Sequence, residues 1–327
     1  MKKKISLITG ITGQDGSYLS EFLLKKKYKV HGLVRRVALE DENHRLWRLR
    51  NITTKINLHP ASLESYASLV KLIQNLKPDE VYHLGAQSYV DYSFKDEFST
   101  ISSNISSAHY CLSAIKEIGL NTKFYFAASS EMFGKVKDVP QNENTPFHPR
   151  SAYGISKVAG FELTRNYRES YGIHASSGIL FNHESEKRGF EFVTRKISMA
   201  VASIKLKKQK YLELGNIQAK RDWGYAPEYV QAMWLMLQQP KPDDYVVGTG
   251  ETHSIKYFVE NAFDVLGLNF QKYLKINKNF FRPSEVDLLV ADSSKIQKLL
   301  GWKARTKINK LIEKMVINDF NLIKKKI

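Results

Sequence analysis

The residues with the clearest chemical potential in this sequence are a glutamate, a tyrosine and a lysine. Glu131 is followed twenty-two positions later by Tyr153, and Lys157 lies four residues beyond the tyrosine. Residues four apart share one helix face, so the lysine charge can favour the phenolate of Tyr153, whose ordinary pKa is about 10. Glu131 adds a second proton-transfer group, which simple hydride transfer does not need. These residues predict redox and acid–base chemistry in one pocket.

The position of the glutamate supports this prediction. Ser129, Ser130 and Glu131 directly follow an apolar strand-like run, residues 124–128. Open α/β sheets bind their ligands at the carboxyl ends of the strands. We therefore expect Ser129 and Glu131 to lie in the active site.

A glycine-rich loop near the start of the chain predicts a nucleotide site. The run Gly10-Ile11-Thr12-Gly13-Gln14-Asp15-Gly16 follows a buried-strand pattern at residues 5–9 and leads into a helix near Ser17. Glycines permit a tight turn and close backbone approach, and a helix N-terminus receives pyrophosphate. The alternative is that the glycines only form a turn, but the flanking strand and helix favour a dinucleotide.

Two arginines predict which dinucleotide binds. Sites for NAD usually carry an acidic residue about twenty positions after the glycines, whereas NADP sites carry a cation. Here Arg35 and Arg36 occupy that place. The planar fork of arginine suits a phosphate, so we predict NADP; the alternative is an arginine pair on a solvated loop.

The pattern around these residues predicts a Rossmann-type, doubly wound parallel sheet. Over the first 180 residues, short apolar runs alternate with helical patterns, as such a sheet requires. The expected strands are residues 5–9, 29–34, 56–59, 80–84, 124–128 and 175–181, and the expected helices are residues 17–27, 66–76 and 103–118. We assign residues 1–180 to an NADP-binding domain and 181–327 mainly to a substrate lobe with helices at 192–205 and 228–238. A segment near 224–250 returns to the first domain.

The composition of the chain bears on its partners, its location and the role of its cysteine. The chain has 327 residues, is 43% apolar and carries a net charge of +17, but its lysines are spread along the chain. Without a basic patch interleaved with aromatic residues, we expect no nucleic-acid partner. No apolar run of membrane-spanning length occurs, so we expect no membrane contact and a cytoplasmic location. The single cysteine, Cys111, lies in an apolar helical stretch, where we expect a buried thiol and no metal site.

Several separate motifs resemble one family, the extended short-chain dehydrogenase/reductases, and within it the GDP-mannose 4,6-dehydratases. The resemblance runs from about Ser6 to Trp302. Besides the glycine loop, its motifs are Leu84-Gly85-Ala86-Gln87-Ser88, Phe181-Asn182-His183-Glu184-Ser185, Val193-Thr194-Arg195-Lys196-Ile197-Ser198, Lys220-Arg221-Asp222-Trp223-Gly224 and Arg282-Pro283-Ser284-Glu285-Val286-Asp287.

The resemblance implies a reaction on a GDP-linked sugar in three steps. Tyr153 would take the C4 hydroxyl proton as hydride passes to NADP, with Lys157 tuning it and holding the nicotinamide ribose. The ketone would acidify the C5 hydrogen, so that Glu131 could remove it and protonate the departing C6 hydroxyl. Hydride would then return to C6. Ser129, where the family usually has threonine, would hydrogen-bond the substrate.

The resemblance also implies two sets of contacts and a homo-oligomer, either a dimer or a tetramer. The implied cofactor contacts are Gly10, Thr12, Gly13, Gln14, Asp15, Gly16, Arg35, Ser62, Leu63, Leu84, Gly85, Ala86, Gln87, Ser88, Tyr153, Lys157, His183 and Arg188. The implied substrate contacts are Ser88, Ser129, Glu131, Asn182, Lys196, Arg221, Arg282 and Glu285. For Asn182 and His183 the alternative is that they satisfy backbone groups at a strand end, and for Arg221 and Arg282 it is surface ion pairing.

Departures from the family pattern bear on the sugar and the assembly. Ser62 replaces an aspartate beside the adenine, Phe98 replaces a tyrosine, and residues 37–48 differ from the usual segment. Some family members act on GDP-linked manno-heptose, so GDP-mannose and GDP-D-glycero-D-manno-heptose are both candidate substrates, and Tyr89 and Asp91 are among the departures. The alternatives are an NADP-dependent 4-reductase or epimerase, which would not need Glu131, and a non-catalytic NADP-sensing or nucleic-acid-binding protein.

Overall fold

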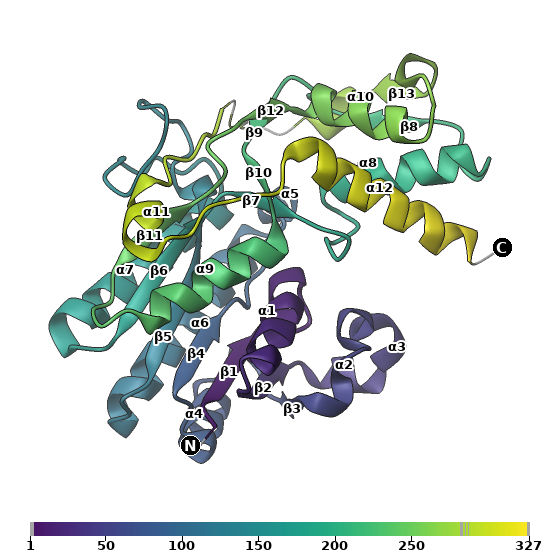
Figure 1. Ribbon diagram of the computed structural model, residues 1–327. Coiled ribbons are helices and arrows are strands. Elements are labelled where there is room, and N and C mark those ends of the chain that lie inside the picture. Colours follow the sequence, from purple (N-terminus) through teal and green to yellow (C-terminus); the bar gives the residue numbers. More distant parts are fainter. Residues whose placement is uncertain (1–2, 282–283, 285, 287, 326–327) are drawn as a thin grey trace.

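The computed structural model describes residues 3–281, 284, 286 and 288–325. Within these residues, the centre is a seven-stranded parallel sheet with strand order β11-β6-β5-β4-β1-β2-β3 (Figure 1). Its strands are β1 (Ile5–Thr9), β2 (Lys29–Val34), β3 (Asn57–Pro60), β4 (Glu80–His83), β5 (Lys123–Ser129), β6 (Ala175–Leu180) and β11 (Asp244–Val247). The predicted Rossmann-type sheet is confirmed.

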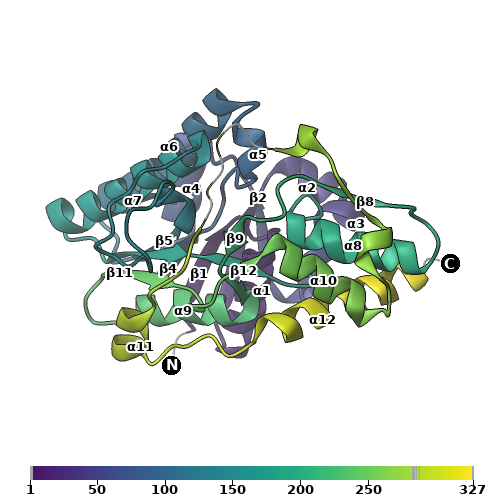
Figure 2. The same cartoon turned by 90° about the horizontal axis from the view of Figure 1, so that it is seen from above.

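Helices cover both faces of this sheet because successive strand residues point to opposite sides. In β1, Leu7 and Ile8 are fully buried, but they belong to different apolar clusters. The cluster around Ile8 is covered by α1 (Gln14–Lys25) and α9 (Ala226–Gln238). The cluster around Leu7 is covered by α4 (Tyr66–Leu76), α6 (Glu97–Ile118) and α7 (Ala152–Tyr171), which lie on the opposite side in Figure 2. Cys111 is buried in this second cluster.

Local capping sets the ends of the long helices. The Asp96 side chain accepts a hydrogen bond from the Ser99 amide at the start of α6, so this helix begins six residues earlier than the predicted residue 103. Ser151 does the same for the Gly154 amide at the start of α7. The cap at Ser151 places Tyr153 in the first turn of α7, beside the end of the sheet.

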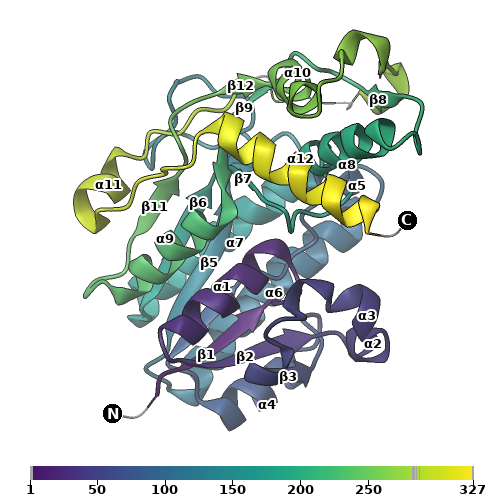
Figure 3. The ribbon, with the colours of Figure 1, turned by 45° about the vertical axis from the view of Figure 1, so that its right-hand side comes forward.

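A smaller lobe is built around a third apolar cluster. Its main helices are α8 (Val193–Lys205), α10 (Ile255–Val265) and α12 (Ile308–Lys324), and α8 and α12 lie side by side in Figure 3. Three short two-stranded sheets connect its segments: β7 (Asn182–Glu184) with β10 (Trp223–Tyr225), β9 (Lys220–Arg221) with β12 (His253–Ser254), and β8 (Leu212–Leu214) with β13 (Leu274–Ile276).

The chain passes between the two lobes more than once. After β6 it enters β7 and the smaller lobe, and it then returns through α9 and β11, which pairs with β6. The remaining helices are α2 (Arg36–Glu40), α3 (Glu42–Arg45), α5 (Val90–Ser93), α11 (Ser294–Leu300) and short 3-10 turns, of which η3 (Ser130–Met132) bears on the site. These crossings bring strand ends of the large sheet against the smaller lobe.

Candidate active site

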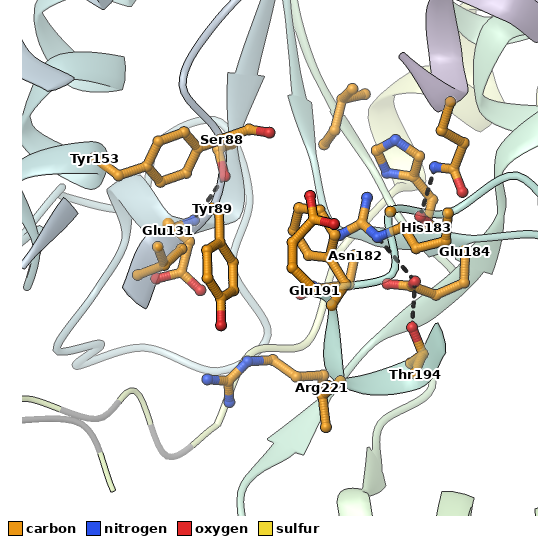
Figure 4. Close-up of a pocket in the computed structure, with 18 of the residues that line it drawn as sticks. Ser88, Tyr89, Glu131, Tyr153, Asn182, His183, Glu184, Glu191, Thr194 and Arg221 are labelled. Atoms are coloured by element: carbon orange, nitrogen blue, oxygen red, sulfur yellow. Dashed lines mark hydrogen bonds and ion pairs between the residues drawn. The ribbon is translucent and has the colours of Figure 1, made fainter. Parts of the chain in front are cut away.

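A cavity of about 480 Å³ lies at the carboxyl ends of the central strands, against the smaller lobe. Figure 4 shows Tyr153, Glu131 and Tyr89 on one side of it and Asn182, His183, Glu184 and Glu191 on the other. The predicted residues that line it are Gly10, Gly13, Gln14, Asp15, Gly16, Leu84, Ala86, Ser88, Ser129, Glu131, Tyr153, Lys157, Asn182, His183, Arg188, Lys196 and Arg221. Most of the residues that the sequence singled out therefore meet in one place.

The glycine loop forms the floor of this cavity. Gly10 has a φ of +73°, and a β-carbon added to it would lie 2.7 Å from the Gly85 amide nitrogen. A β-carbon on Gly16 would lie 2.4 Å from the Gly10 carbonyl oxygen, which accepts a hydrogen bond from the Gly13 amide at 3.0 Å. Only glycine therefore fits at these two positions. Helix α1 starts at Gln14, inside the glycine-rich run and three residues before the predicted Ser17, so Gly16 lies in its first turn.

Asp15 and His183 tie the glycine loop to the smaller lobe. His183 Nε2 lies 2.7 Å from Asp15 Oδ2, and His183 Nδ1 lies 2.7 Å from the Phe181 carbonyl oxygen. Burial alone would lower the pKa of His183, but the Asp15 charge and the hydrogen bonds to Asp15 and Phe181 together outweigh burial, so the pKa is raised. Burial likewise opposes ionisation of Asp15, yet His183 lowers its pKa. Both ring nitrogens of His183 thus serve the structure, although the residue lines the cavity.

Ser129 and Glu131 lie where β5 ends, as predicted. The Ser129 hydroxyl accepts a hydrogen bond from the Glu131 amide at 3.2 Å, which shapes the short turn η3. This turn directs the Glu131 side chain into the cavity on the same side as Tyr153 (Figure 4).

Tyr153 and Lys157 face the same cavity from the first turns of α7. Lys157 Nζ donates a hydrogen bond to the Ala127 carbonyl at 2.8 Å and lies 5.8 Å from the centre of the Tyr153 ring. Burial raises the pKa of Tyr153 to about 12, although interaction with the Ser129 hydroxyl works in the other direction. Burial lowers the pKa of Lys157 to about 8. The pKa of Tyr153 is therefore raised by burial, and not lowered as the lysine spacing predicted.

The cavity end away from Tyr153 is rich in cations. Arg221 is buried and donates to the Val286 carbonyl at 2.5 Å, and Lys196, on α8, lies over the Phe280 ring at 4.1 Å. Asn182 begins β7, where it is paired with Trp223 of β10. The structure supports a buried position for Arg221 rather than a surface ion pair. Arg282 and Glu285, which were also expected here, lie outside the described residues.

Some predicted cofactor residues lie around the cavity instead of lining it. Arg35 is exposed at the end of β2, where it precedes α2, and Ser62 and Leu63 follow β3. The loop after β4 is held by Asn104, whose side chain accepts from the Gln87 amide at 2.8 Å and donates to the Gln87 carbonyl at 3.0 Å. Gly85 packs on Leu63, and Thr12 accepts a hydrogen bond from Arg48 through its carbonyl.

Sequence patterns alone did not identify several lining residues. Arg48 reaches the glycine loop by donating to the carbonyls of Thr12 at 3.2 Å and Lys187 at 2.6 Å. Buried Glu184 lies 3.0 Å from Arg188 Nε and accepts from Thr194 at 2.5 Å. Arg48 has no periodic or motif signal in the sequence, and Glu184 has only its place inside the motif that contains Asn182.

Among the described residues, no group of three or more His, Cys, Asp or Glu could hold a metal.

Comparison with known proteins identifies the family. Residues 7–315 match the family model described as GDP-mannose 4,6 dehydratase. The chain belongs to this family. GDP-mannose 4,6 dehydratase 1 of Arabidopsis thaliana is 49% identical over 331 residues, covering 99% of this chain and 91% of that protein. GDP-mannose 4,6 dehydratase of Homo sapiens is 43% identical over 345 residues, covering 98% of this chain and 93% of that protein.

Solved structures with lower identity share the fold of this GDP-mannose 4,6 dehydratase family member. A UDP-glucose 4-epimerase from Thermotoga maritima, solved with UDP-glucose, has a TM-score of 0.84 at 19% identity and covers 98% of this chain and 99% of its own. RMD from Pseudomonas aeruginosa, complexed with NADPH, has a TM-score of 0.82 at 22% identity and covers 98% and 100%. Among the described residues, no helix has the length and apolar character needed to cross a bilayer.

Proposed function

We propose that this protein removes water across C5 and C6 of a GDP-linked manno-configured sugar, GDP-mannose or GDP-D-glycero-D-manno-heptose, with NADP as its resident cofactor. The observation that carries the proposal is that Glu131 and Tyr153 face one cavity whose floor is the glycine loop. Family membership supports the sugar nucleotide. A 4-reductase or epimerase would use Tyr153 and Lys157 but has no task for Glu131.

The glycine loop fits a dinucleotide because its surface consists of bare backbone. Gly10, Gly13 and Gly16 line the cavity without β-carbons, and the N-terminus of α1 opens onto it. Lys157 would hold the nicotinamide ribose, and Arg35, at the end of β2, would read a 2′-phosphate. When bound, the nicotinamide supplies a hydride acceptor for C4 and a hydride donor for C6.

Tyr153 would act on the sugar at the C4 hydroxyl. A phenol with a pKa of about 12 gives a strong base, but few phenolates form at neutral pH. Lys157, with a pKa of about 8, stays mostly protonated at neutral pH and places positive charge beside the ring. Ser129 can donate to the same substrate oxygen. Tyr153, beside the positive charge of Lys157, would therefore take the proton of the C4 hydroxyl. Ser129 would hold the C4 oxygen in place.

Glu131 would carry out the elimination. A ketone at C4 acidifies the hydrogen on C5, so a carboxylate on this side of the cavity can remove it as a base. The same group, now protonated, can deliver that proton to the C6 hydroxyl, which leaves as water. When hydride returns to C6, C5 must take up a new proton, which Glu131 can pass on from solvent. Arg221 and Lys196 would meanwhile bind the diphosphate at the cationic end and fix the sugar against Glu131.

Replacing Glu131 by Gln tests this function directly. The variant keeps the shape of the side chain but loses the proton-transfer group, so we expect water loss to slow about 10²–10⁴-fold while NADP and GDP-sugar still bind. Mass spectrometry of the product from each GDP-sugar measures water loss, and calorimetry measures binding. Glu64→Gln, an exposed glutamate outside the cavity, is the matched control. Undiminished water loss in Glu131→Gln would contradict the proposal.

A further inference from the structure

A buried ion pair joins α8 to α12, and the reaction steps above do not use it. Arg195 is fully buried on α8, and its Nη2 lies 2.7 Å from Oδ1 of Asp319, which is fully buried on α12. Ser198 donates a hydrogen bond to the other carboxylate oxygen of Asp319 at 2.6 Å. The two helices lie side by side in Figure 3. Because desolvation offsets much of the attraction within a buried ion pair, stability alone does not account for these charges.

The same guanidinium holds the loop that follows β7. Arg195 Nη1 donates hydrogen bonds to the carbonyl of Glu186 and, at 3.2 Å, to the carbonyl of Arg188. The carbonyl of Lys187, between these two, accepts from Arg48 Nε at 2.6 Å. The planar fork of an arginine can direct several donors at once, so Asp319 on one side fixes the direction in which Arg195 meets the loop.

This loop carries Arg188, one of the cofactor contacts that the resemblance implies, into the cavity. Arg188 lines the cavity, its Nε lies 3.0 Å from Glu184 Oε2, and its guanidinium lies 3.7 Å from the centre of the Phe192 ring. Burial raises the pKa of Tyr153 to about 12, and the Arg188 charge works in the other direction. The same charge acts on Asp15 in the glycine loop. Arg188 is therefore a cation within reach of both the glycine loop and the phenol.

The position of that cation depends on the backbone that Arg195 holds. One of the two carbonyls bound by Arg195 belongs to Arg188 itself, so a shift of this carbonyl carries the Arg188 side chain with it. An arginine meets a phosphate through directed, parallel hydrogen bonds, which a displaced backbone weakens. Arg195 and Asp319 do not line the cavity, so any effect they have on a ligand must pass through the loop.

We propose that Arg195 and Asp319 are positioning residues, which hold the backbone of Arg188 so that its guanidinium meets the phosphates of NADP. This inference rests on the proposed function, because it takes NADP as a ligand of the cavity. It gives the motif that runs from Val193 to Ser198 a second task, besides the contact of Lys196 with the substrate.

A double-mutant cycle on NADP affinity tests the inference, with calorimetry on the wild-type protein, Asp319→Asn, Arg188→Ala and the double variant. Asparagine keeps the size of the side chain but removes the charge that orients Arg195. We expect Asp319→Asn to weaken NADP binding about tenfold, and to have no further effect once Arg188 is alanine. Ser198→Ala, which removes one hydrogen bond to Asp319, should weaken NADP binding in the same direction by less.

Met315→Ala is the matched control for a general loss of stability. Met315 is fully buried on the same helix as Asp319, in the apolar cluster of the smaller lobe. Its truncation leaves a cavity and should lower the midpoint of urea unfolding, but NADP affinity should stay at the wild-type value.

The outcomes separate the inference from the proposed function. Wild-type affinity in both Asp319→Asn and Ser198→Ala would overturn the inference, and so would an undiminished effect of Asp319→Asn when Arg188 is alanine. A similar loss of affinity in Met315→Ala would also overturn it. If Asp319→Asn does not fold, Ser198→Ala decides by the same criteria. If the wild-type protein binds no NADP, the proposed cofactor is wrong and the inference fails with it, whereas an absence of water loss alone contradicts only the proposed reaction.

Discussion

At the scale of single residues, burial shapes the ionisable groups of the site. Tyr153 and Lys157 are both almost fully buried, and burial shifts their pKa values in opposite directions, to about 12 and about 8. Both shifts disfavour charge, so the phenolate–ammonium pair is costly to form unless each charge compensates the other. The fixed hydrogen bond from Lys157 to Ala127 keeps the ammonium close enough for this role.

The proposed preference for NADP over NAD rests on one exposed arginine, Arg35. Arg36 is paired with Glu40 at 3.0 Å, whereas Arg35 stands at the end of β2, where a 2′-phosphate would lie. We expect Arg35→Ala to weaken NADP binding about 10–100-fold and NAD binding much less, because only NADP carries that phosphate. Titration with both dinucleotides measures this, with Arg36→Ala as the control. Equal losses for NADP and NAD would show that Arg35 does not read the phosphate.

The Asp15–His183 pair predicts a pH-dependent stability. The raised pKa of His183 gives stability that is fully present below its unfolded value of about 6.5 and is lost as pH rises through the folded value. The lowered pKa of Asp15 keeps its carboxylate charged throughout that window. We expect Asp15→Asn to cost about 1.5–3 kcal/mol of unfolding free energy at about pH 6 and less at about pH 9. Denaturant titrations measure this, and a cost that grows with pH would contradict the account.

At the scale of elements, the glycine loop between β1 and α1 packs directly against the loop after β4. Gly10 and Gly172 both have positive φ, +73° and +67°, but only Gly10 has backbone atoms where a β-carbon would go. Alanine at either position costs roughly 1–2 kcal/mol for the left-handed backbone. Gly10→Ala should cost clearly more and should also weaken NADP binding, because it pushes the Gly85 loop away.

Urea unfolding and NADP titration of the two alanine variants test this difference. We expect Gly172→Ala to bind NADP like the wild-type protein, because Gly172 ends α7 far along the helix from Tyr153 and has no atom within 4 Å of the added carbon. If the two variants lose equal stability and equal affinity, the close packing of Gly10 on Gly85 has no functional weight.

At the scale of the whole molecule, some features could be predicted from the chain and others could not. The bounds predicted for β1, β2 and α4 match the structure, because continuous apolar runs and helical periodicity are local signals. The predicted start of α6 was wrong, because the stretch after Asp96 is rich in serine and only the Asp96 cap signals that a helix begins there. The three short sheets of the smaller lobe could not be predicted, since their strands have only two or three residues.

In the candidate site, too, some residues could be predicted from the sequence and others could not. Tyr153, Glu131 and the glycines were predicted because each stands at the end of a strand or the start of a helix, and parallel strands bring such ends together. Arg48 was not predicted, because its place depends on the segment after β2 folding back onto the carbonyls of Thr12 and Lys187. Such contacts follow from tertiary packing and leave no local pattern in the sequence.

The fate of the C5 hydrogen tests the central claim most directly. The protein would be incubated with NADP and a GDP-linked manno-sugar in heavy water, and the product would be examined by mass spectrometry and NMR. If Glu131 removes the C5 proton while the hydride from C4 returns to C6, the product has lost one water and carries deuterium at C5 and none from solvent at C6. A product that has lost water without deuterium at C5, or that has lost no water, would contradict the account.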